Sequence, residues 1–234
     1  MKSARKRRSC LKLNCSRFIK TRRVNCDTIL GSNLAACQLM TSRSQSAISI
    51  QLPDWSADLI AGTDAIFPTP ESRMHLAIRL ARMNIEHGTG GPFGAAVFDM
   101  DTHALLAIGM NLVVPSSCSM AHAEMIAISC AQQKLGRFDL GGTPSRYELA
   151  TSCEPCAMCF GAIPWSGIRH LACGARDADA RAIGFDEGPK MSDWKAALES
   201  RGITVETDIC RQGAADVLQQ YAKADGNIYN GRHA

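Results

Sequence analysis

The chain has 234 residues, of which 46% are hydrophobic and 21% charged, which is typical of a globular protein and excludes wholesale disorder. Its net charge of +4 is unevenly distributed, because residues 1–43 hold 11 of the 26 Lys and Arg and a single acid, Asp27. The remainder carries 15 basic and 21 acidic residues, a net charge of −6. Such a body repels phosphate, so we expect no nucleic-acid partner. No apolar run approaches the roughly 20 residues that cross a membrane.

Residues 1–66 differ in composition from the rest, and we expect a basic, disordered N-terminal extension and linker there, followed by one domain over residues 67–234. Three interpretations of the basic start remain open. It is a mitochondrial-type targeting segment, a basic arm for nucleic acid or membrane, or the product of a misplaced gene start, with Met40 as the true first residue. The odd number of cysteines, 11, and a Cys-x-x-Cys spacing favour a reducing compartment, and we expect a cytoplasmic protein.

Helices and strands are expected to alternate beyond residue 70. Apolar residues of 71–87 share one helical face, and the runs 94–99 and 105–111 flank a turn and predict a hairpin. Further helices are expected over 122–135, 155–165, 178–183, 192–200 and 214–224, and further strands over 147–151, 170–175 and 203–209. This alternation predicts an α/β fold with one sheet covered on both faces.

Two short segments indicate a metal site: His122-Ala123-Glu124, and Pro155 to Cys159 some thirty residues later. The Cys-x-x-Cys spacing supplies two thiolates, and one imidazole completes three ligands, which leaves a tetrahedral zinc one open position, as catalysis requires. We therefore predict Zn²⁺ bound by His122, Cys156 and Cys159. Cys153 and Cys156 have the same spacing and remain an alternative pair of ligands, although Pro155 favours the pair Cys156 and Cys159. Cys118 and Cys130 are expected in the core.

Glu124 suits proton transfer rather than coordination. Two residues apart in mid-helix, His122 and Glu124 would diverge by about 200°, so the motif requires that His122 begin its helix. Glu124 then takes a proton from water and passes it to a departing amine. The two segments together match the zinc-dependent nucleobase deaminase signature. The alternative, a buried histidine with inert thiols, leaves the carboxylate beside the histidine unexplained.

The sequence resembles the cytidine-deaminase superfamily and, within it, the guanine deaminases. The similarity runs from about Met74 to the C-terminus. It implies a three-layer α/β/α sandwich with a mixed sheet, a homodimer, and zinc-dependent hydrolysis of guanine to xanthine and ammonia. The segments that carry it, besides the two zinc segments, are Gly91-Pro92-Phe93-Gly94, the strand ending at Asn111, the stretch from Gly161 to Trp165, and the stretch from Ala182 to Pro189.

The resemblance also implies roles for single residues. Glu187 is expected to be a second proton carrier, and Asn111 to hydrogen-bond the purine. Further expected pocket residues are Phe93 and Trp165 against the ring, Ala123 beside the substrate, and Tyr229 as a cap. From the residues alone, Asn111 equally suits a strand end, Glu187 a solvated loop, and the two aromatic residues a core.

Other functions share parts of this pattern. A tRNA adenosine deaminase has the same zinc segments, and Gly174 to Ala178 also resembles that group, but the acidic body argues against binding an anticodon loop. A pyrimidine deaminase is a second enzymatic alternative. The alternative from another class is a zinc-stabilised nucleic-acid-binding module that acts through residues 1–43. We expect the substrate to be a small purine base.

Overall fold

The structure, a computed structural model, describes residues 48–60, 66–142 and 146–231. Residues 49–234 form the second of two units of the chain. The expectations for the basic N-terminal extension fall on residues 1–47 and lie outside the described residues. Among the described residues, no helix is both long and apolar enough to span a membrane.

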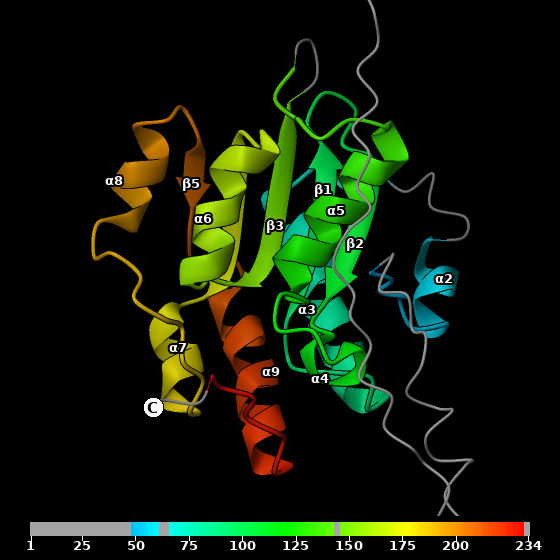
Figure 1. The fold of residues 1–234 in the computed structure, drawn as a ribbon. Coiled ribbons are helices and arrows are strands. Elements are labelled where there is room, and N and C mark those ends of the chain that lie inside the picture. The colour runs from blue at the N-terminus through cyan, green and yellow to red at the C-terminus, as the bar shows by residue number, and fades with distance from the viewer. Residues whose placement is uncertain (1–47, 61–65, 143–145, 232–234) are drawn as a thin grey trace, which may run out of the picture. The chain divides into compact units, whose positions relative to one another are not determined.

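A mixed five-stranded sheet forms the centre of the second unit (Figure 1). The strand order is β2-β1-β3-β4-β5, in which β1 pairs antiparallel with both β2 and β3, and β4 runs parallel to its neighbours β3 and β5. The predicted hairpin is therefore present. The strands are β1 (Gly94–Asp99), β2 (Leu105–Met110), β3 (Tyr147–Cys153), β4 (His170–Ala175) and β5 (Thr204–Glu206).

Helices cover both faces of this sheet. On one face α3 and α9 share a core with β1, β3 and β4, and on the other α5, α6 and α8 form a second core against the same strands. This arrangement is the expected three-layer α/β/α sandwich. The helices are α3 (Pro70–Glu86), α5 (Ala123–Leu135), α6 (Ala157–Ser166), α7 (Asp177–Ala182), α8 (Trp194–Glu199) and α9 (Arg211–Lys223).

Helix α3 is fixed at its start and along its buried face. Thr69 and Ser72 form a reciprocal cap, in which each side-chain hydroxyl accepts the other residue's backbone N–H at 3.1 and 3.2 Å. Arg73 lies on the buried face and donates two hydrogen bonds to Glu148 of β3, at 2.6 and 3.2 Å. The ion pair therefore joins α3 to the strand that leads into the Cys-x-x-Cys segment.

Two short helices were not expected, α2 (Trp55–Ile60) and α4 (Val113–Ser116). Residues 55–60 fall within the expected linker, yet they are helical, since Trp55 stacks on His87 at 5.4 Å and donates to the hydroxyl of Thr89 at 3.1 Å. Strand β5 spans three residues instead of the seven expected, because only residues 204–206 pair with β4.

Candidate metal centre and adjoining pocket

His122 and Cys156 occupy equivalent positions at the starts of two helices. His122 is the N-cap of α5 and Cys156 the N-cap of α6, both with extended backbone conformations. The side chain of an N-cap residue leaves the helix end-on, so both groups project toward the same space. The requirement that His122 begin its helix is met. Pro155, expected inside the first turn of α6, lies instead just before the N-cap.

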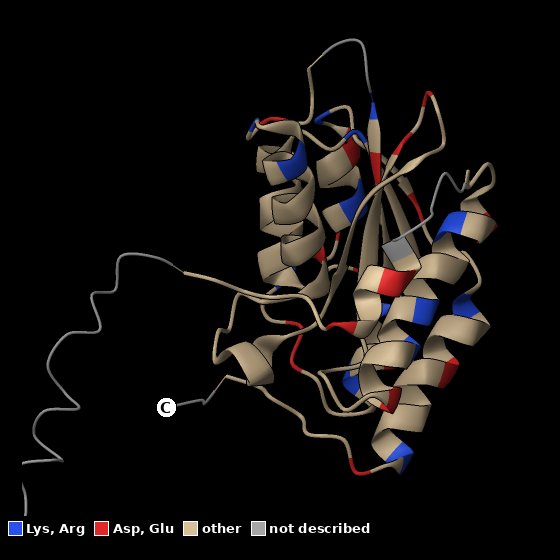
Figure 2. Ribbon diagram, turned by 90° about the vertical axis from the view of Figure 1, so that its right-hand side faces the viewer, with Lys and Arg blue, Asp and Glu red and all other residues tan. Residues whose placement is uncertain are grey.

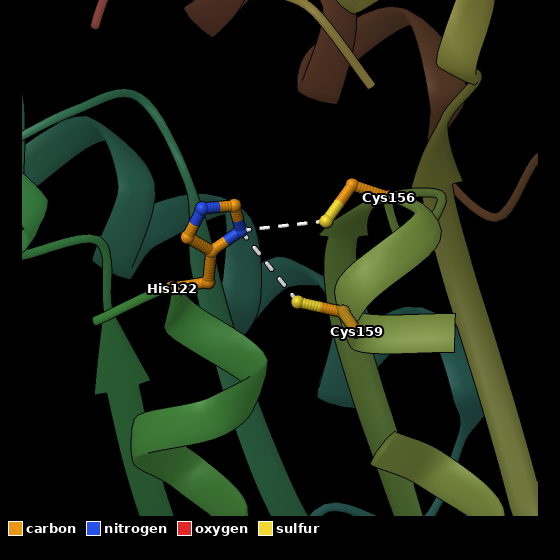
Figure 3. Close-up of side chains that lie close together, drawn as sticks. All are labelled: His122, Cys156 and Cys159. Atoms are coloured by element: carbon orange, nitrogen blue, oxygen red, sulfur yellow. Dashed lines mark hydrogen bonds between the residues drawn. The ribbon is translucent and has the colours of Figure 1, made fainter. Parts of the chain in front are cut away.

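The three predicted ligands lie together (Figure 3). Nδ1 of His122 is 3.5 Å from Sγ of Cys156 and 3.6 Å from Sγ of Cys159. A tetrahedral zinc with Zn–S of about 2.3 Å and Zn–N of about 2.0 Å separates nitrogen from sulfur by roughly 3.5 Å. These separations and the donor set fit Zn²⁺. Cys153 is not part of the cluster, because its thiol contacts the carbonyl of Arg176 at 3.5 Å.

The Cys156 thiol is poised to ionise. The hydrogen bond from Cys159 lowers the pKa of Cys156 to about 4, and contact with His122 acts in the same direction. Cys156 also stands at the N-terminus of α6, whose positive end favours a thiolate. Since a metal ligand must be deprotonated, the site has one thiolate ready before a cation binds.

Glu124 follows His122 into the first turn of α5 and is 7% exposed. Burial raises the pKa of the Glu124 carboxyl above its ordinary value, and the negative charge of Cys156 adds to the rise. A buried carboxyl group whose pKa is raised holds a proton more readily and can accept and return it, as a general acid–base group must.

A cavity of about 160 Å³ opens beside the cluster. It brings together most of the predicted site residues, which are separated by up to 94 positions in the chain. Those lining it are Phe93, Asn111, His122, Glu124, Cys156 and Glu187. Two expected substrate contacts do not line it. Trp165 is 87% exposed on α6. Ala123, the first residue of α5, is fully buried, and its carbonyl faces Gly109 of β2.

Asn111 and Glu187 both line the cavity, and hydrogen bonds fix the backbone of each. The backbone N–H of Asn111 donates to the carbonyl oxygen of Phe93 at 3.0 Å, and the side-chain oxygen of Asn111 accepts from the N–H of Val113 at 3.2 Å. The carbonyl of Glu187 accepts from the N–H of Ala157, the first residue of α6, at 2.9 Å. Both residues are nearly buried, at 2% and 6% exposed, so neither side chain belongs to a solvated loop.

Glu187 has an unusual charge environment. Burial raises the pKa of its carboxyl to about 8, and the negative charges of Cys156 and Glu124 act in the same direction. Such a group retains a proton near neutral pH and can donate it within the cavity.

A model of the cytidine and deoxycytidylate deaminase zinc-binding region matches residues 68–175. A guanine deaminase of Bacillus subtilis is 39% identical over 133 residues, 57% of this chain and 81% of that protein. The chain belongs to the cytidine and deoxycytidylate deaminase family. The solved guanine deaminase from Nitrosomonas europaea is 46% identical with a TM-score of 0.73, covering 78% of this chain and 100% of that one. A tRNA-specific adenosine deaminase of Buchnera aphidicola is 29% identical over 150 residues, 64% of this chain and 91% of that protein.

Several residues that line the cavity lie outside the two zinc segments of the sequence. Phe185 lies in the stretch from Ala182 to Pro189, and the centre of its ring is 5.0 Å from that of Phe93 and 5.1 Å from that of Tyr229. Tyr229, expected as a cap, does line the cavity, and its hydroxyl packs against Gly91, where a Cβ would collide with it. Asn230 also lines the cavity and had no signal in the sequence, because the segment after α9 reaches the site only through tertiary folding.

Proposed function

We propose that this protein hydrolyses guanine to xanthine and ammonia. The observation that carries the proposal is the set of carboxyl groups facing one small cavity beside a cluster that fits zinc, in a chain similar to guanine deaminases over most of their length. The cavity is smaller than the roughly 300 Å³ at which sites for drug-sized ligands begin. A single base is therefore a better occupant than a nucleotide.

Each ligand and proton carrier has a place in this reaction. His122, Cys156 and Cys159 would hold Zn²⁺, which when bound supplies a water of lowered pKa. Glu124, two residues after the ligand His122, takes the proton from the attacking water and passes it toward the amine that leaves C2 of guanine. Its burial excludes bulk solvent from that transfer.

The remaining cavity residues bind the base and complete the proton transfers. Asn111 offers an amide that can donate to and accept from the purine edge, and its fixed backbone orients it before the substrate arrives. Glu187 serves as the second proton carrier, since deamination moves protons at both the ring nitrogen and the amine. The rings of Phe93 and Phe185 form an apolar wall against which a flat base can pack.

Deamination of adenosine in tRNA is the competing activity, because that family shares the zinc segments. The electrostatics of the cavity favour the free base. Its lining includes four acids, Glu124, Glu154, Asp186 and Glu187, and among the described residues that line it none is Lys or Arg. A phosphodiester chain entering this mouth would find no Lys or Arg among these lining residues to neutralise its phosphates, which costs affinity. Figure 2 shows the two signs of charge interspersed along the helices of the body.

A substrate panel tests the proposal. Purified, zinc-loaded protein is given guanine, adenine, cytosine, their nucleosides and an anticodon stem-loop containing adenosine, and ammonia release is followed. We expect turnover of guanine with stoichiometric xanthine. Inosine in the stem-loop without xanthine would favour the tRNA enzyme, and nucleic-acid binding without any ammonia would favour the non-enzymatic module.

The role of Glu124 is tested by Glu124→Ala. Zinc content and melting temperature should stay near wild type, because Glu124 is not a proposed ligand, while kcat falls by about a factor of 10² to 10⁴, the usual contribution of general acid–base catalysis. Glu199→Ala, at an exposed position of α8, is the matched control and should keep full activity. An active Glu124→Ala enzyme would refute the mechanism.

We also propose a cytoplasmic homodimer that acts in purine catabolism. Trp165 and Phe138 are 87% and 84% exposed, and large aromatic side chains are enriched in protein interfaces. The cysteines in the described part of the chain are free thiols, which a reducing compartment preserves. Light scattering on wild type and on Trp165→Ala checks the assembly. A monomeric wild-type enzyme would remove the dimer and leave the chemistry intact.

A further inference from the structure

Lys190 is a buried cation that contacts the segment preceding Cys156. Only 6% of its side chain is exposed, and its ammonium lies 3.2 Å from Oδ1 of Asp177 and 3.6 Å from Oε2 of Glu154. It also donates to the carbonyl of Pro155 at 3.1 Å and sits 4.8 Å above the ring of Trp194. The ammonium therefore has one hydrogen-bond acceptor, two carboxylates and an aromatic face around it.

Two partners of Lys190 lie in the segment that leads into the proposed metal site. Pro155 directly precedes the proposed zinc ligand Cys156, and Glu154 lines the cavity. Lys190 itself ends the short loop that carries Glu187, three residues earlier. One ammonium thus joins the segment holding a metal ligand to the loop holding the second proton carrier.

A second cation holds the same loop from outside. Arg181 donates to the carbonyl of Gly188 at 3.0 Å and pairs with Asp177 at 2.6 Å, but 43% of its side chain is exposed. Exposed ion pairs are screened and contribute little, whereas removing one member of a buried pair leaves an uncompensated charge. Of the two cations, Lys190 therefore has the stronger hold on the loop.

We propose that Lys190 is a positioning residue for deamination, which fixes the loop of Glu187 against the Pro155–Cys156 segment so that the proton carrier and the metal cluster keep one geometry. This inference rests on the proposed guanine deaminase activity. Lys190 does not line the cavity, so it acts through Glu187 and not on the substrate. Misplacement of a reacting group by about 1 Å can cost a factor of 10² in rate, and this contact prevents such a shift.

A double-mutant comparison separates positioning from general structural support. Lys190→Met keeps the aliphatic stem and removes the charge and its hydrogen bonds. We expect kcat on guanine to fall about ten- to hundredfold with KM changed less than about threefold. In a Glu187→Gln background the same substitution should change kcat by less than about twofold, because the group that Lys190 positions is already gone. An equal loss in both backgrounds would overturn the proposal.

Lys195→Met is the matched control. Lys195 is a partly buried lysine of α8 that donates to Thr207 at 3.3 Å, away from the Glu187 loop, and its removal should leave kcat unchanged. Zinc content and melting temperature are measured for every variant. If Lys190→Met does not fold, Lys190→Gln, which retains a donor for the carbonyl of Pro155, replaces it in the same comparison.

A readout independent of turnover distinguishes this inference from the proposed function. Amide hydrogen exchange in zinc-loaded protein should quicken about tenfold or more in Lys190→Met at residues 184–190 and at Ala157, whose N–H binds the Glu187 carbonyl. Exchange elsewhere should not change. If wild type lacks activity on guanine but the loop loosens as expected, the substrate assignment fails and the positioning contact stands. Unchanged exchange in the loop would overturn the positioning role itself.

Discussion

Replacement of Arg73 by Met should cost the protein a large part of its stability. The guanidinium of Arg73 and the carboxylate of Glu148 are 3% and 5% exposed at their side chains and share two hydrogen bonds. Arg73→Met fills nearly the same volume but leaves the Glu148 carboxylate buried between α3 and β3 without its partner.

The magnitude follows from that burial. Breaking a buried pair by removing one partner costs about 3–5 kcal/mol, because the remaining charge has lost its compensation. For a body of this size each kcal/mol lowers the melting temperature by about 2–4 °C, so the expected loss is roughly 6–20 °C. The double variant Arg73→Met/Glu148→Gln buries no charge and should recover at least about 1 kcal/mol relative to the single variant.

Urea unfolding followed by circular dichroism measures these differences. Arg79→Met is the control, since Arg79 is exposed on the same helix and has no ion partner in the described part of the chain, and its effect should stay within about 0.5 kcal/mol. Equal stabilities of Arg73→Met and Arg79→Met, or a double variant less stable than Arg73→Met, would show that the buried pair does not hold α3 to the sheet.

Three further changes have defined outcomes. Glu187→Gln removes the second proton carrier and should lower kcat by about a factor of 10² or more at unchanged zinc content; unchanged kinetics would return Glu187 to a structural role. Gly109→Ala would place a Cβ against the backbone of Ala123, so we expect α5 to shift and both zinc affinity and melting temperature to fall, and wild-type values would contradict the packing. The Arg211 guanidinium lowers the pKa of Asp179 from its ordinary 3.8, so the carboxylate stabilises the fold above that pH and the contribution is lost as pH falls through the lower value. Asp179→Asn should therefore destabilise the protein more at pH 6 than at pH 3, and an equal difference at both values in unfolding titrations would exclude the linkage.

Most of the fold could be predicted because apolar residues recur at regular intervals along the long helices and strands. Helix α3 buries one face, and β3 is buried along its whole length, so both give a strong signal. The short helices α2 and α4 were missed. Helix α4 has only four residues, too few for a helical period, and Trp55 orders α2 through residues more than thirty positions away. The length of β5 depends on its pairing with β4, which no local pattern specifies.

The metal cluster was easier to predict than the pocket. Its ligands obey local rules, two thiols in one turn and an imidazole at a helix start, and the structure brings those three together. The walls of the cavity come from the ends of strands, the loop of Glu187 and the C-terminal segment, which only the tertiary fold assembles. Asn230 shows this most clearly, because it reaches the loop by hydrogen bonds to Asp186 and Gly184, both at 2.8 Å and more than forty positions away. Trp165 was expected in the pocket from resemblance alone, and in this chain it faces outward.

The coordination of zinc in the purified protein tests the central claim most directly. X-ray absorption at the zinc edge should show one nitrogen at about 2.0 Å, two sulfurs at about 2.3 Å and one further light atom from solvent. The nitrogen should disappear in His122→Ala and one sulfur in Cys159→Ser, while Cys153→Ser leaves the spectrum unchanged. A shell of three or four sulfurs, or a Cys153→Ser spectrum that differs from wild type, would contradict a catalytic site built from His122, Cys156 and Cys159.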